Sequence, residues 1–178
     1  MREAQEDALR AIDAATQRLL QTVNRFSDRD VERPSLLHGW SRGHVLTHVA
    51  QSADAMRTLL AGARTGVPVA AYASQEARDT AIENGARRSA AGLRVELSSA
   101  VERFRAEASA LPENAWRRPV SVLGGAEFPA AQLLDRLLVE VELHHTDLDA
   151  GYGPQQWTLA FAAMSLPEPM RTQRQDRR

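Results

Sequence analysis

The chain has 178 residues, of which 43% are hydrophobic and 25% are charged, as in an ordinary globular protein. Its length is most simply that of one domain with a full hydrophobic core. The formal net charge of −1 gives no basic surface of the kind that binds nucleic acid or an anionic membrane, so we expect neither partner.

All 22 basic residues are arginine, and no cysteine is present. A folded protein has no physical need to exclude lysine, so this composition indicates a high-GC coding genome such as that of an actinobacterium. Actinobacteria have their own low-molecular-weight thiol. Without cysteine the chain can form no disulfide, cysteine nucleophile or thiolate ligand. Any thiol chemistry therefore requires a thiol from outside the protein.

The sequence gives no sign of membrane insertion or export. It contains no apolar run long enough to cross a bilayer. The N-terminus, Met-Arg-Glu-Ala-Gln-Glu-Asp, is too acidic and polar for a signal peptide. We therefore expect a cytoplasmic protein.

The first half of the chain has the apolar spacing of helices. A first helix is predicted over residues 3–27, followed by a loop over 28–39 that contains proline and glycine. Ser41 is expected to cap a second helix that ends before Gly66. A third helix is predicted over 74–85.

The second half begins with a fourth helix over 89–111, which Ser89 is placed to cap. A long connection over 112–128 follows, with a short β-turn expected at 123–126. Pro129 suits the first turn of a fifth helix that runs to about residue 149. One more short helix is expected over 157–166.

These elements predict an all-α fold. No segment alternates with period two for long, and no repeat or glycine-rich phosphate loop occurs. The predicted architecture is a four-helix bundle with extra short helices over residues 1–166. The charged tail over 167–178 is expected to be disordered.

Four of the five histidines form two pairs, His44/His48 and His144/His145, in segments that are predicted to be helical. A helix returns to the same face after four residues, so Glu140 lies on the same face as His144. Two such helices facing each other would place two imidazoles and one carboxylate around a single cation. That ligand set leaves one coordination position open, which is typical of a catalytic metal site.

The alternative to a metal site is a hydrogen-bonded Glu140–His144 pair in a polar core network. The spacing alone does not choose between the metal site and this pair. Both groups lie near the apolar face of their helix, where burial without partners would cost several kcal/mol. A histidine pair such as His44/His48 is more often structural or exposed than metal-binding. A metal-free helical bundle is therefore the plain alternative.

Other polar and aromatic residues near these motifs have two possible roles each. Asp147 could accept a hydrogen bond from the second nitrogen of a ligand histidine, although we favour a helix-end residue that bonds solvent. Asp54 is expected either to point into the same cavity or to solvate a helix surface. Trp40 and Trp116 are expected to be core or loop anchors rather than side chains that stack on a substrate.

The motifs Gly-His44-Val-Leu-Thr-His48 and Glu140-Val-Glu-Leu-His144-His145, with their flanking residues, resemble the mycothiol-dependent maleylpyruvate isomerase family. That family belongs to the DinB-like superfamily of four-helix metalloproteins, and the resemblance covers roughly residues 5–160. It implies that His48, Glu140 and His144 hold a divalent metal, usually zinc. His44 and His145 are then neighbours rather than ligands.

The resemblance also implies a function. A divalent metal, zinc foremost, would activate mycothiol as a co-substrate for attack on an electrophilic substrate. The implied partners are a small-molecule thiol and a small-molecule electrophile, acting on a monomer or homodimer. Nickel, iron and manganese suit the same ligands. The alternative from another class is a non-catalytic DinB-like metal-binding or stress-response module.

Isomerases of this family carry a second, C-terminal α/β domain that supplies a catalytic arginine. The residues after Trp157 no longer resemble the family, and the sequence given stops at Arg178. We therefore expect that domain to be absent. A thiol S-transferase, which needs only the metal and a thiol pocket, is then favoured over the isomerase reaction itself.

Overall fold

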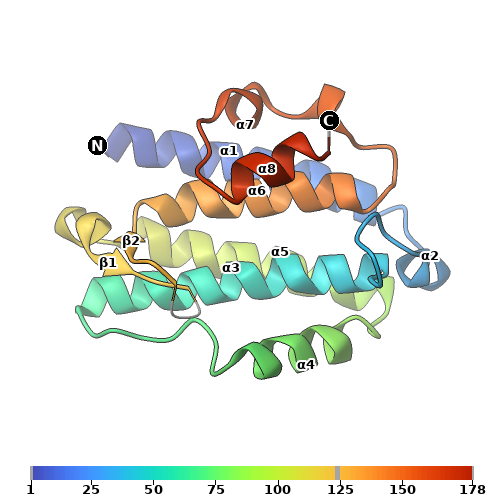
Figure 1. Ribbon diagram of the computed structural model, residues 1–178, viewed down its shortest axis with the longest axis horizontal. Helices are drawn as coiled ribbons and strands as arrows, with labels where there is room; N and C mark the ends of the chain where they lie inside the picture. Colours follow the sequence, from blue (N-terminus) through green and yellow to red (C-terminus); the bar gives the residue numbers. More distant parts are fainter. Residues whose placement is uncertain (1, 123–124, 178) are drawn as a thin grey trace.

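The structure, a computed structural model, describes residues 2–122 and 125–177. Its main body is formed by α1 (Arg2–Val23), α3 (Arg42–Thr65), α5 (Ala90–Ser109) and α6 (Gln132–Asp147). In Figure 1, α1 and α6 run in one direction, and α3 and α5 run in the other. The predicted all-α fold, a four-helix bundle with extra short helices, is confirmed.

Shorter elements surround the bundle. They are α2 (Asp28–Glu32), α4 (Gln75–Gly85), η1 (Glu113–Arg117), β1 (Pro119–Val120), β2 (Phe128–Pro129), η2 (Pro154–Gln156), α7 (Leu159–Ala163) and α8 (Met170–Gln175). Figure 1 shows α4 along the outer side of α3, while α7 and α8 lie next to α6. Within the described residues, no helix combines the length and the apolar character that crossing a membrane requires.

Serine caps begin three helices, and the caps at Ser41 and Ser89 were predicted. Ser41 accepts a hydrogen bond from the backbone N–H of His44, whose side chain in turn bonds the backbone of Ser41. Ser74 and Ser89 each accept from the N–H three residues further along. Helix α3 ends before Gly66, whose φ of 77° lies in the left-handed region that favours glycine.

The core lies between the facing sides of the four long helices. Each fully buried large apolar side chain contributes about 1.5–3 kcal/mol by leaving water. The large, fully buried side chains of this core include Ile12, Leu19, Leu46, Leu59, Leu60, Leu93, Leu97, Phe104, Leu133 and Leu137. This packing fixes α3 against α6, and these two helices carry the residues of the candidate site.

The start of α6 differs from the prediction. Pro129 lies in β2 and pairs with Pro119 of β1, and α6 begins three residues after it. The backbone N–H of Ala130 donates to the carbonyl of Arg118, which ties this segment to the preceding connection. Proline fits this short edge because it has no N–H to donate. The expected β-turn at 123–126 lies partly outside the described residues.

The charged tail also differs from its expectation of disorder. Residues 170–175 form α8, which contacts α6. The guanidinium of Arg174 donates to the carbonyl of Phe161, and that of Arg177 pairs with Asp147. The tail is charged, but two of its charges have specific partners in the fold, and these contacts hold the segment against the bundle.

Candidate metal centre

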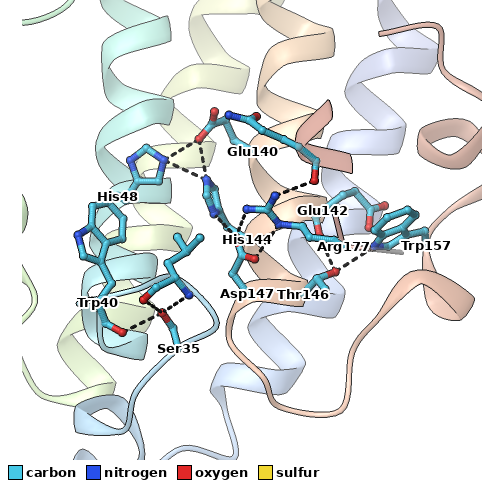
Figure 2. Close-up of polar contacts among 12 residues, drawn as sticks. Ser35, Trp40, His48, Glu140, Glu142, His144, Thr146, Asp147, Trp157 and Arg177 are labelled. Carbon is cyan, nitrogen blue, oxygen red and sulfur yellow. Dashed lines mark hydrogen bonds and ion pairs between the residues drawn. The ribbon is translucent and has the colours of Figure 1, made fainter. Parts of the chain in front are cut away.

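Helices α3 and α6 bring three side chains to one point. His48 comes from α3, and Glu140 and His144 come from α6; Figure 2 shows them pointing toward one another. His48 Nε2 lies 2.9 Å from Glu140 Oε2 and 3.1 Å from His144 Nε2, and His144 Nε2 lies 3.4 Å from the same carboxylate oxygen. The structure therefore brings together the three residues that the sequence singled out as ligands.

The spacing of these donor atoms fits a small divalent ion. An ion bound tetrahedrally at 2.0–2.1 Å separates neighbouring ligand atoms by about 3.3 Å, close to the separations of this cluster. Glu140 Oε2 is buried and, apart from its ion pairs with the two rings, has no hydrogen-bond partner within the described part of the chain. A buried carboxylate oxygen without a hydrogen bond is costly, and an ion at this point would satisfy it.

The side chains of the cluster are partly accessible to solvent. The Glu140 side chain is 27% exposed, while those of His48 and His144 are 11% and 13% exposed. Three protein ligands that solvent can partly reach leave room for a further ligand atom. This arrangement is suited to binding a small molecule next to the ion.

The three groups perturb one another electrostatically. Burial raises the pKa of Glu140, but His144 and His48 outweigh burial and hold that pKa well below its usual value. Burial lowers the pKa of His144, yet Asp147 and Glu140 prevail and raise it to about 9. For His48 burial prevails, and its pKa is lowered despite the nearby Glu140.

Asp147 supports His144 from behind, as Figure 2 shows. His144 Nδ1 lies 2.8 Å from Asp147 Oδ2, and Arg177 donates to both oxygens of that carboxylate at 2.7 Å. Asp147 is only 1% exposed, so the solvent-bonded role that the sequence favoured is wrong. When the ring is neutral, as a metal ligand must be, this carboxylate holds the proton on Nδ1 of His144 and leaves the lone pair of Nε2 facing the cluster.

His48 has two neighbours on its other side. The edge of the Trp40 ring packs against it, with 5.4 Å between the ring centroids, so Trp40 is an anchor at the site itself. Arg78 of α4 donates from Nη2 to His48 Nδ1 at 3.0 Å. Sequence reasoning missed Arg78, because nothing in the pattern of α4 indicates that it approaches a histidine 30 residues away.

The two remaining histidines of the motifs have structural partners. His44 completes the cap at Ser41, and its Nε2 lies 3.3 Å from Glu83. His145 Nε2 lies 2.8 Å from Thr22 Oγ1, and its ring stacks on Tyr152 with 3.6 Å between centroids. Both residues are therefore neighbours of the cluster, as the resemblance implied.

A second buried polar group on α6 was also missed. Glu142 is 1% exposed and accepts from Arg18 at 3.0 Å, from Thr158 at 2.7 Å and from the Tyr152 hydroxyl. These donors lie 124, 16 and 10 residues away in the sequence, so no helical spacing marks the network. Because Glu142 is fully satisfied by protein donors, it acts as a structural tie between α6, α1 and α7.

Asp54 is not part of the centre. Its two carboxylate oxygens accept from Arg103 of α5 at 2.9 and 2.6 Å, in an exposed pair. Of the two roles that the sequence allowed, the structure shows the surface role.

Comparison with known proteins places the fold and the motifs in one family. The family described as "Mycothiol maleylpyruvate isomerase N-terminal domain" matches residues 12–149. No curated protein sequence matches the chain. Two solved structures are similar: the mycothiol-dependent maleylpyruvate isomerase, at 28% identity, and a histidine-to-alanine mutant of that enzyme, at 27%. Each superposes with a TM-score of 0.83 over 88% of this chain, which spans 65% of their length.

Proposed function

This chain belongs to the mycothiol maleylpyruvate isomerase N-terminal domain family, and from that premise we propose that it is a metal-dependent enzyme that uses mycothiol. The proposed ligands are His48, Glu140 and His144, and the proposed ion is zinc. The proposed reaction is attack of the thiol on a small electrophile, as in a thiol S-transferase or a maleylpyruvate isomerase-like enzyme.

The convergence of three donor atoms within 3.4 Å of one another carries the proposal. A divalent ion held by two imidazoles and one carboxylate keeps a net positive charge, and such an ion lowers the pKa of a thiol that reaches its open position. The protein residues hold and orient this set. Asp147 fixes the ring of His144, Trp40 packs against that of His48, and the bundle keeps α3 at a constant distance from α6.

The thiol is proposed from two observations. The chain contains no cysteine, so the thiol of the proposed reaction would come from outside the protein. The similar solved structures are those of a mycothiol-dependent enzyme. Mycothiol is therefore the co-substrate that we propose for this chain.

Elemental analysis of the purified protein tests the metal site. We expect about one equivalent of zinc in the wild type and none in His48→Ala, because the two remaining ligands, both on α6, are too few to hold the ion. His38→Ala is the matched control, since His38 is an exposed histidine outside the cluster. Zinc content that survives the loss of all three proposed ligands would reject the site.

Turnover tests the enzyme. The zinc-loaded protein is expected to conjugate mycothiol to an electrophile such as 1-chloro-2,4-dinitrobenzene, and His48→Ala is expected to lose that activity. A protein that binds zinc and mycothiol in a thermal-shift assay but turns over no electrophile would instead be a binding module.

A further inference from the structure

Arg78 occupies a position that matters for any ion at the candidate centre. Its guanidinium donates from Nη2 to His48 Nδ1 at 3.0 Å and from Nη1 to Asp79 at 3.0 Å. It also lies near the ring of Tyr72, 5.9 Å from the centroid. The Arg78 side chain is 18% exposed and that of Asp79 is 56% exposed, so the guanidinium spans from a proposed ligand to the surface.

The contact with His48 fixes where the proton of that ring lies. Arginine has only donors, so His48 Nδ1 must accept and cannot carry a proton. The proton of the neutral ring is then on Nε2, the atom that faces Glu140 and His144. In this arrangement Nε2 has no lone pair to offer a cation.

Cation binding requires the opposite arrangement. A neutral histidine that binds an ion through Nε2 carries its proton on Nδ1, and that N–H must donate to an acceptor. Arg78 provides no acceptor, so two donors would face each other across 3.0 Å. The Arg78–His48 hydrogen bond and an ion on His48 Nε2 therefore exclude each other.

We propose that Arg78 competes with the divalent ion for His48, and that the guanidinium displaced by the ion binds a carboxylate of the small-molecule substrate. This inference rests on the proposed function of the same site. The displaced side chain is already paired with the exposed carboxylate of Asp79, which can hold it at the surface next to His48. A planar guanidinium fork next to a cationic centre favours a carboxylate ligand.

Zinc affinity, measured by competition with a chromogenic chelator, tests the first half. Arg78→Gln is expected to bind zinc about tenfold more tightly than the wild type, within the range known for groups that contact metal ligands. The glutamine oxygen accepts from Nδ1–H, as the arginine cannot.

Arg136→Gln is the matched control. Arg136 lies one turn before Glu140 on α6, over the Phe128 ring, and forms no ion pair with any residue that the structure describes. Its loss removes the same charge near the cluster without removing a hydrogen bond to a ligand. We expect its effect on zinc affinity to be clearly smaller, and equal effects in the two variants would overturn the proposed competition.

Imidazole ¹⁵N NMR of the wild type tests the same point without a substitution. His48 Nδ1 is expected to have the shift of an unprotonated nitrogen without zinc and that of a protonated nitrogen with zinc. A protonated Nδ1 in the zinc-free protein would overturn the inference.

Succinate, a carboxylate without thiol or alkene, is the probe for the second half. Calorimetry is expected to show at least about tenfold weaker succinate binding to zinc-loaded Arg78→Gln than to the zinc-loaded wild type, as for loss of a charge-assisted hydrogen bond. Tighter zinc together with weaker succinate in one variant is a pattern that general damage to the fold would not produce. Unchanged succinate binding would overturn the carboxylate site.

These outcomes separate this inference from the proposed function. If neither the wild type nor either variant binds zinc, the proposed metal centre fails, and the inference fails with it. If all three bind zinc with equal affinity, the proposed centre stands and only the role of Arg78 is overturned.

Discussion

His144 and His145 are neighbours in the chain, yet their imidazoles lie in different surroundings. His144 contacts two carboxylates, which raise its pKa to about 9 against the effect of burial. Burial, with the charges of Arg18 and Arg25, lowers the pKa of His145 to about 3. Successive side chains on a helix point about 100° apart, so one residue belongs to the metal centre and the next to the packing against α1.

Replacement of His145 by glutamine is predicted to flatten the pH dependence of stability. Unfolded His145 titrates near 6.5, whereas the folded residue titrates near 3. Between these values the unfolded chain binds more protons, so this contribution is complete above about pH 6.5 and is lost as the pH falls toward 3. Urea unfolding of His145→Gln and wild type at pH 7 and pH 4.5 measures the difference.

The exposed His38 provides the comparison for that experiment. His38→Gln is expected to leave the pH dependence of the free energy of unfolding as in the wild type. The same slope in His145→Gln as in the wild type would show that His145 is free to protonate in the folded protein.

At the scale of elements, the helices that begin with a serine cap could be predicted from the sequence. Ser41, Ser74 and Ser89 cap their own helices through hydrogen bonds to residues three positions away, so the sequence contains both partners. Strands β1 and β2 and helix α8 depend on contacts with distant segments, such as the Arg177–Asp147 pair. Such contacts leave no periodic pattern in the sequence.

The residues of the candidate centre likewise fall into two groups: those that the sequence could predict and those that only the tertiary structure shows. Glu140 and His144 were predictable as a pair because a four-residue spacing places them on one helix face. His48 required the resemblance to choose it over His44. Arg78 and Arg177 reach the cluster from α4 and from the segment after α8, and only the tertiary structure shows them there.

Helix α3 packs so closely on the end of α4 that it requires glycine at position 43. A Cβ atom built on Gly43 would lie 2.4 Å from the carbonyl oxygen of Ala86, a backbone atom that cannot move alone. Gly43→Ala is therefore predicted to lower the free energy of unfolding by about 1–3 kcal/mol, as overpacking does. Gly153→Ala is the control, because its Cβ would meet only ordinary contacts at 3.8 Å. Equal stability of the two variants would contradict the close packing.

The segment that follows α8 is predicted to strengthen the metal centre through Arg177. Loss of Arg177 frees the Asp147 carboxylate that orients His144, and such supporting groups typically change metal affinity about tenfold or more. Arg177→Gln is therefore expected to bind zinc about tenfold more weakly in a chelator competition. Arg171→Gln, which breaks only an exposed pair with Glu168, is expected to have no effect. Equal zinc affinities in the two variants would remove Arg177 from the site.

At the scale of the molecule, the proposed centre connects parts of the chain that are distant in sequence. His48 and His144 are 96 residues apart, and their approach depends on the packing of α3 against α6. The unfolded chain therefore does not hold His48 next to Glu140 and His144. An ion that binds the folded state preferentially must stabilise that state.

Zinc is accordingly predicted to raise the thermal and chemical stability of the whole domain. At a free zinc concentration of about 100 times the dissociation constant, the gain is about 2.7 kcal/mol. Denaturant unfolding with zinc and with a chelator measures it, and His48→Ala is expected to show no such difference. A zinc-dependent gain that persists in His48→Ala would place the ion elsewhere.

The bond between Arg177 and Asp147 also bears on how the protein is best handled in the laboratory. A purification tag or fluorescent fusion joined next to Arg177 would strain the connection that reaches His144, whereas one placed ahead of α1 leaves it intact. Preparations with a tag joined next to Arg177 are therefore expected to understate the strength with which this domain retains its ion.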